Sequence, residues 1–196
     1  MNRKKSGSDS SIQWFQALLY LGLVDLISTI MGFVLSVPSD ITGYIIIGLR
    51  ASMTICYFQL IPIHHRYKKA AIFQAVVFLG TFIEAFASEV SVVDWVTIVF
   101  LLLGRYQEYT GHSEVIAGKN AKLSKKWNSL FKWELVAGVL LSVLTFLVST
   151  ALVVMNIDHT LKIVVSIMSV PMCVFDVLYL VYMNRMLTCL DESEVR

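Results

Sequence analysis

The chain has 196 residues, of which 57% are hydrophobic and only 15% are charged. Soluble domains carry about one quarter of charged residues, so this apolar excess is too large for one compact water-soluble core. The composition therefore predicts an integral membrane protein. The formal net charge is only +2, and the lysines fall in short segments between apolar runs, so nothing in the charge pattern indicates a nucleic-acid partner and we expect none.

Six apolar stretches follow one another along the chain, each long enough to cross about 30 Å of hydrocarbon as a helix. They span residues 12–37, 43–63, 70–89, 92–114, 134–155 and 161–183. Residues 1–11 and 184–196 are expected to be polar tails. The sequence thus predicts a single all-α membrane domain, a polytopic bundle of about six transmembrane helices.

Lysine and arginine gather on one side of this predicted topology. That side receives the basic residues of segments 3–5, 66–69, 119–132 and 185–196, whereas the loops of the other side hold Lys162 as their only basic residue. Cytosolic loops of membrane proteins carry the excess of lysine and arginine. We therefore expect a multi-pass protein of the cell membrane with both termini in the cytosol.

Residues 119–133, between the fourth and fifth apolar stretches, have an amphipathic pattern. Leu123, Trp127 and Leu130 fall on one helical face, and the lysines fall on another. This pattern predicts a helix that lies in the headgroup layer of the bilayer, with its lysines near anionic lipid. The alternative is a docking surface for a partner subunit in the membrane or the cytosol.

The first two helical hairpins share sequence features. The segment FQALLYLG at 15–22 resembles FQAVVFLG at 73–80, and IIIGLR at 45–50 resembles FLLLGR at 100–105. Both hairpins enter from the same side, so a true repeat would be parallel. The similarity favours related hairpins, with chance likeness between apolar helices as the alternative.

Ionisable residues interrupt the apolar helices at several depths. A charge at the bilayer centre costs at least about 2.5–3.5 kcal/mol, so each one needs a partner or a function. Helical rise places Arg50 and Glu84 in the outer third of the membrane, and Asp25 and Arg105 near its middle. We expect these residues to form two ion pairs in that combination, with Asp176 as a further intramembrane charge.

The fourth helix is expected to carry a polar half into the membrane. Residues 94–104 alone give only about 15 Å of helix, half a bilayer, so the helix must continue through His112. Polar residues then lie on one face of this helix, and a similar polar stripe lies on the second helix. Together the two polar faces predict a hydrated interior open to the cytosol. The candidate binding residues are Arg50, Tyr57, Arg105, Tyr106, Glu108, Tyr109 and His112.

Three functions fit such an interior. The first is a transporter or membrane solute-binding subunit for a small polar, in particular anionic, molecule held by the two arginines. The second is an intramembrane enzyme with Glu108, His112, His64 and Asp176 on its cytosolic side. Glu108, His112 and His64 are its candidate metal ligands, although the ExxxH spacing is a weak signal and no HExxH motif is present. The third is an accessory or immunity-type subunit whose charges only hold the helices in register. We expect transport rather than catalysis, and no cofactor is predicted.

Overall fold

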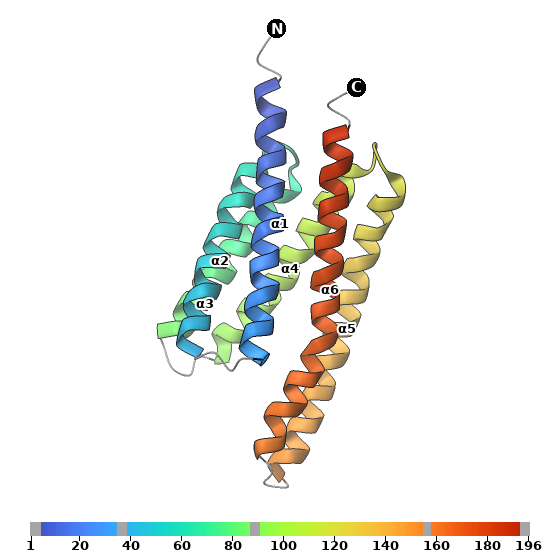
Figure 1. The fold of residues 1–196 in the computed structure, drawn as a ribbon. Coiled ribbons are helices and arrows are strands. Elements are labelled where there is room, and N and C mark those ends of the chain that lie inside the picture. Colours follow the sequence, from blue (N-terminus) through green and yellow to red (C-terminus); the bar gives the residue numbers. More distant parts are fainter. Residues whose placement is uncertain (1–4, 35–38, 87–90, 155–157, 193–196) are drawn as a thin grey trace.

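The computed structural model describes residues 5–34, 39–86, 91–154 and 158–192, and these residues form six α-helices. The helices are α1 (Lys5–Val34), α2 (Ser39–Leu60), α3 (Arg66–Phe86), α4 (Ser91–Ile116), α5 (Ala121–Val154) and α6 (Asp158–Glu192). Each packs against the next in the chain, and α1 also packs against α6, so the bundle closes on itself. The first turn of α1 and the last turn of α6 lie at the same end, which we call the terminal end (Figure 1).

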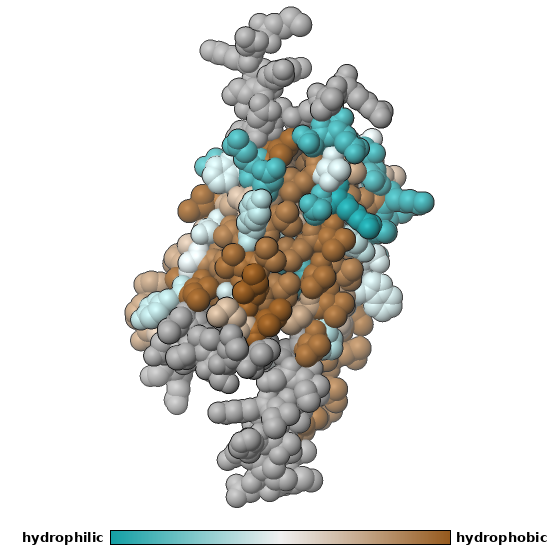
Figure 2. All heavy atoms as spheres, viewed as in Figure 1, coloured by the Kyte–Doolittle hydropathy of each residue, from teal (hydrophilic) through white to brown (hydrophobic). Residues whose placement is uncertain are grey.

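Within the described residues, four of the helices contain stretches long and apolar enough to cross a membrane. These stretches are Ser11–Met31 in α1, Gly43–Leu60 in α2, Arg66–Phe86 in α3 and Val170–Glu192 in α6. Large apolar side chains also cover the outside of the bundle, where they form a broad band below a hydrophilic cap at the terminal end (Figure 2). The chain is therefore an all-helical protein whose architecture is compatible with a helical membrane bundle.

The helix ends differ from the expected ones in a way that local chemistry explains. α2 ends at Leu60 rather than at residue 63, because the residue before Pro62 is driven out of the helical conformation. α1 and α6 extend into segments that were expected to be tails, beginning at Lys5 and ending at Glu192. The prediction that the fourth helix continues past Gly104 is confirmed, since α4 reaches Ile116.

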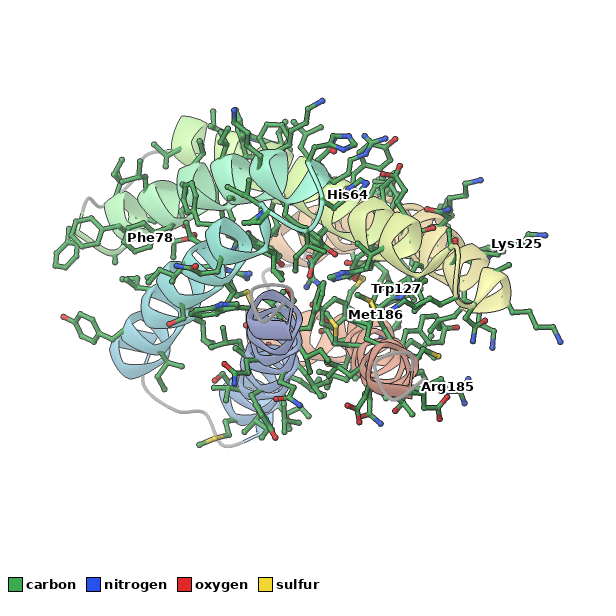
Figure 3. All side chains as sticks on the ribbon, turned by 90° about the horizontal axis from the view of Figure 1, so that it is seen from above. His64, Phe78, Lys125, Trp127, Arg185 and Met186 are labelled. Atoms are coloured by element: carbon green, nitrogen blue, oxygen red, sulfur yellow. The ribbon has the colours of Figure 1, made fainter. Side chains whose placement is uncertain are left out.

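The structure corrects the prediction of a separate headgroup helix at 119–133. α5 is one helix from Ala121 to Val154, and the expected segment forms its first turns. The apolar face was placed correctly, but Leu123, Trp127 and Leu130 are at most 4% exposed and lie in the protein core. In the view along the bundle, Trp127 and Met186 point toward each other in the interior (Figure 3). This face of the segment therefore packs against protein rather than lipid.

The two similar segments play unequal parts in the packing. Phe15 is buried, whereas its counterpart Phe73 is only partly buried. Gln74 is buried, whereas its counterpart Gln16 is exposed. Both segments end in a glycine at which another helix comes close. α6 lies against Gly22 of the first segment, and α4 lies against Gly80 of the second. A common origin of the hairpins stays a prediction.

Gly80 is the tightest of these close approaches, and we expect its substitution to destabilise the protein. A Cβ atom at this position would collide with Oγ1 of Thr97 on α4. Gly80→Val should therefore lower the free energy of unfolding by about 1–3 kcal/mol, as overpacking generally does. Thermal unfolding in detergent measures this loss. Gly48→Val is the matched control, because nothing lies within 4 Å of a Cβ there; equal losses in both variants would contradict the close approach.

Candidate functional site

A small cavity lies inside the bundle, with lining residues from α1, α2, α3, α4 and α6. Its volume is about 20 Å³, which is room for about one water-sized group. Charged and polar side chains make up most of the lining, together with Gly22 and Met53. They are Asp25, Arg50, Tyr57, Gln74, Arg105, Glu108, Asp176 and Tyr179. The structure thus brings four of the predicted binding residues to one place: Arg50, Tyr57, Arg105 and Glu108.

The ion pairs of this site are not the expected ones. Arg50 pairs with Asp25 across α1 and α2, with 4.0 Å between Nη2 and Oδ2. Arg105 pairs with Asp176 on α6 at 3.6 Å and with Glu134 on α5 at 4.0 Å. The expected pairs of Arg50 with Glu84 and of Asp25 with Arg105 are therefore wrong. Glu84 lies exposed on α3. Helical rise gives the depth of a residue but not the direction in which it points.

Arg105 is held in place by aromatic side chains as well as by carboxylates. Its Nη1 donates a hydrogen bond to the Tyr109 hydroxyl at 3.3 Å, and that hydroxyl donates to Oε2 of Glu134 at 2.6 Å. The guanidinium carbon lies 5.5 Å from the centre of the Tyr179 ring and 5.9 Å from that of Tyr109. Such cation–π contacts are favourable where water is excluded. The guanidinium is thus fixed by charge, hydrogen bond and ring contact together.

A chain of acid–base groups leads from the cavity toward the terminal end. Tyr179 donates a hydrogen bond to Oε1 of Glu108 at 2.6 Å, and Nε2 of His112 lies 3.4 Å from the same oxygen. Nδ1 of His112 is hydrogen-bonded to the Tyr67 hydroxyl at 2.8 Å. Nε2 of His112 has no hydrogen-bond partner among the described residues, so its approach to Glu108 is an electrostatic contact. Glu108 and His112 are 3% and 0% exposed, which separates this pair from solvent.

Formal charge around the cavity is negative overall. The lining contains the carboxylates of Asp25, Glu108 and Asp176, and Glu134 lies behind Arg105. Only the two guanidiniums of Arg50 and Arg105 oppose them in the lining, and both are paired with carboxylates. In the lining, three carboxylates therefore face two guanidiniums. A site with this surplus of negative charge attracts a cation rather than an anion.

One predicted binding residue faces away from the cavity. Tyr106 is 41% exposed, and its ring packs against Phe131 with 5.3 Å between the ring centres. It follows Arg105 by one position, and one helical step turns a side chain by about 100°. Tyr106 therefore belongs to the outer surface of α4. Tyr109 and His112 lie within the hydrogen-bonded network but not in the cavity lining.

Several members of the site had not been singled out in the sequence. Glu134 directly follows the predicted amphipathic segment 119–133, and it reaches Arg105 and Tyr109. Tyr179 follows Asp176 by three positions, so a helical-face argument on α6 was enough to find it. Tyr67 and Gln74 carried no such signal, because only the packing of α3 on α2 and α4 turns them inward.

A second polar cluster joins the α2–α3 connection to the end of α4. Arg66 donates hydrogen bonds through Nε and Nη2 to the two carboxylate oxygens of Glu114, at 3.4 and 3.1 Å. Nη1 of Arg66 also donates to Gln107 at 3.3 Å. His64 Nε2 lies 3.1 Å from Oε2 of Glu114. The cluster thus fastens the connection to α4 through one bidentate ion pair and its neighbours.

His64, His65 and Glu114 have ligand atoms within 4.8 Å of one another, which is the spacing of a metal site. The donor chemistry argues against one. Nδ1 of His64 accepts a hydrogen bond from the backbone N–H of Arg66 at 3.3 Å, so in the neutral ring Nε2 carries the proton and donates to Glu114. The Arg66 guanidinium also forms an ion pair with the Glu114 carboxylate. His64, a candidate partner of Glu108 and His112, is instead engaged with Glu114.

The pKa of His64 gives a direct check on this cluster. Burial disfavours the protonated ring and lowers the pKa of His64, while the Glu114 carboxylate opposes that shift. We expect Glu114→Gln to lower the pKa of His64 further, because the opposing charge is removed. Histidine NMR titration measures the change. Glu84→Gln, at the other end of α3, is the control; an unchanged or raised value in Glu114→Gln would contradict the contact.

The sign of the pH effect follows from the lowered pKa. A folded protein that prefers neutral His64 is stabilised by this group above the unfolded-state pKa, and loses that contribution as pH falls through the folded-state pKa. Acidification should therefore loosen the α2–α3 connection.

Comparisons of the chain with protein-family models, with curated proteins and with solved structures find no match. The function must therefore be argued from the site itself.

Proposed function

We propose that the chain is a small membrane transporter or membrane solute-binding protein whose charged interior cavity takes up a small monovalent cation. The observation that carries this proposal is the surplus of carboxylates over guanidiniums around an interior cavity. Buried charges within a membrane bundle are rare and mark ion pathways, proton relays or substrate sites. Ion pairs that serve only to hold helices together need no surplus of one sign and no cavity between them.

The sign of the charge revises the expected ligand. The expectation of an anionic solute rested on Arg50 and Arg105, and both arginines have carboxylate partners. The oxygen atoms left to the cavity belong to carboxylates, to the hydroxyls of Tyr57 and Tyr179, and to the amide of Gln74. Oxygen donors of this kind suit hard cations. The volume of about 20 Å³ fits a bare ion, ammonium or a hydrated proton.

Protons fit the same site through the Glu108–His112 pair. Histidine changes its charge in the physiological pH range, and its partners here are a carboxylate and a tyrosine hydroxyl. This line of groups runs from the cavity toward the end of α4 that carries the His64–Glu114 cluster. We therefore propose that uptake of the cation is coupled to release of a proton toward the terminal end.

Our topology for this role has six membrane crossings and the terminal end in the cytosol. The first turns of α3 and α5, which carry Arg66, Lys68 and Lys69 and Lys122, Lys125 and Lys126, lie at the same end of the bundle as the chain termini (Figure 1). This favours a cytosolic orientation of that end by the positive-inside rule. α4 and α5 complete the crossings, with the polar face of α4 turned toward the other helices. A larger solute requires the helices to separate, and Pro171 within α6 offers a point of bending.

Thermal stabilisation by simple ions tests the proposal. Melting temperatures of the purified protein are compared in sodium, potassium and ammonium chloride at constant ionic strength, and across pH. We expect one cation to raise the melting temperature in a saturable way, and Glu108→Gln to abolish the rise. Asp191→Asn, an exposed carboxylate on α6, is the matched control. No ion-specific stabilisation, or an equal one in Glu108→Gln, would overturn the proposal.

A further inference from the structure

Two adjoining hollows run along the outer face of the α5–α6 pair and together form a groove that is basic at one end and apolar at the other. Lys126 lines both hollows. α5 and α6 are neighbours throughout this region, so the groove follows the seam between them (Figure 1). This groove is separate from the charged cavity, and the cavity residues take no part in it.

The basic end lies near the terminal end of the bundle and has a volume of about 340 Å³. Lys122, Lys126 and Arg185 line it, against a single carboxylate from Glu192. Among the described residues, neither Lys122 nor Arg185 is part of an ion pair. Arg185 points outward from α6, away from the core residue Met186 (Figure 3). This end therefore presents available positive charge to an anion.

The apolar end has a volume of about 300 Å³ and continues the groove toward the middle of the helices. Aromatic and aliphatic side chains dominate it: Leu130, Trp133, Val174, Phe175, Leu178 and Tyr182. Trp133 and Val174 are 65% and 55% exposed, so this end opens to the surroundings of the bundle. Lys126 bridges the two ends, with Nζ 5.8 Å from the centre of the Tyr182 ring.

The dimensions of the groove match one leaflet of a bilayer. Arg185 and Val174 are eleven positions apart on α6, which is about 16 Å of helix and about half of the hydrocarbon thickness. Tyr182, whose ring lies beside Lys126 where the two ends meet, is a residue type typical of the boundary between headgroups and hydrocarbon. Basic pockets between helices on the cytosolic side bind anionic headgroups.

We infer that this groove binds an anionic phospholipid of the adjoining leaflet, with its phosphate on Lys122, Lys126 and Arg185 and an acyl chain along the apolar end. The inference requires the bilayer orientation but not the cation site. A soluble anion would use only the basic end, and an apolar peptide would not need the cations. The continuity of both ends through Lys126 is what selects a lipid.

The test compares phosphatidylglycerol with phosphatidylcholine of the same acyl chains, added to delipidated protein in detergent. Native mass spectrometry and melting temperature report binding. We expect phosphatidylglycerol to be retained and to raise the melting temperature by several degrees, with little effect of phosphatidylcholine. Lys122→Ala/Lys126→Ala/Arg185→Ala should lose most of the difference. Lys68→Ala/Lys125→Ala/Lys132→Ala removes the same charge at exposed positions outside the groove and should keep it.

A second variant separates a lipid from a soluble anion. Val174→Trp fills the apolar end at an exposed position and leaves the cations intact, so it should weaken retention of phosphatidylglycerol. Inorganic phosphate and glycerol phosphate serve as soluble probes. Stabilisation by these anions equal to that by phosphatidylglycerol would overturn the lipid assignment. So would equal losses in the two triple variants, or an unchanged Val174→Trp. Failure of the cation proposal would leave all these outcomes unaffected.

Discussion

Replacing Arg105 by methionine should destabilise the protein by about 1–3 kcal/mol, because it removes the counter-ion of carboxylates that are only partly exposed, 13% for Glu134 and 32% for Asp176. Arg105 is the common partner of Asp176, Glu134 and the Tyr109 hydroxyl. Methionine keeps most of the apolar bulk but leaves these carboxylates without their counter-ion. Thermal and detergent-induced unfolding of the purified variant measures the loss. Arg66→Met is the matched control and should lose less, because Arg66 has a single carboxylate partner among the described residues, Glu114, which is 38% exposed.

Neutralising the partners together should restore much of that stability. Arg105→Met/Glu134→Gln/Asp176→Asn removes the charge imbalance that the single variant creates, so its unfolding should return toward that of the unmodified protein. The same variant distinguishes structure from function. A folded triple variant that still shows ion-specific stabilisation would mean that these charges only hold the helices together. A triple variant as unstable as Arg105→Met would contradict the pairing itself.

Trp127→Ala should destabilise the protein by about 3–5 kcal/mol, as truncation of a fully buried aromatic side chain generally does. Trp127 is 0% exposed, and its ring lies 4.8 Å from that of His112 and 5.5 Å from that of Tyr179, measured between centres. The substitution therefore opens a cavity directly beside the Glu108–His112 pair. The loss should appear in thermal unfolding of the purified variant.

Trp133→Ala is the matched control for this prediction. Trp133 lies on the same helix but is 65% exposed, so its removal should change the stability far less. Equal losses of stability in Trp127→Ala and Trp133→Ala would contradict the burial of Trp127 in the protein core. They would favour instead the position at the membrane surface that the amphipathic pattern alone predicted for the start of α5.

The α5 segment shows why part of the architecture could not be predicted. Apolar residues at helical spacing predicted its buried face correctly, including Leu123 and Trp127. A helix that packs on protein and a helix that lies in headgroups have the same amphipathic pattern, so the pattern does not identify what covers the face. For α4 the prediction that the helix continues past Gly104 is confirmed, since α4 reaches Ile116; helical rise alone was enough to predict this extension, whereas a membrane crossing by α4 stays a prediction.

The ion pairs illustrate the same limit for the site. Depth along the helices correctly indicated that Arg50 and Arg105 need partners within the bundle. It did not identify those partners, because pairing depends on which helices are neighbours and on the direction of each side chain. Asp25 meets Arg50 because α1 packs on α2, and Asp176 meets Arg105 because α4 also contacts α6. The net charge of the cavity, and with it the proposed ligand, follows only from that arrangement.

Direct binding of radiolabelled sodium to the purified protein tests the central proposal, with potassium, ammonium and protons as unlabelled competitors. The cavity of about 20 Å³ predicts saturable binding of about one cation per chain, by sodium itself or by a competitor that displaces it. Binding should be lost in Glu108→Gln but kept in Asp191→Asn. Absence of saturable, competed binding, or equal binding by Glu108→Gln, would contradict a cation site in the interior.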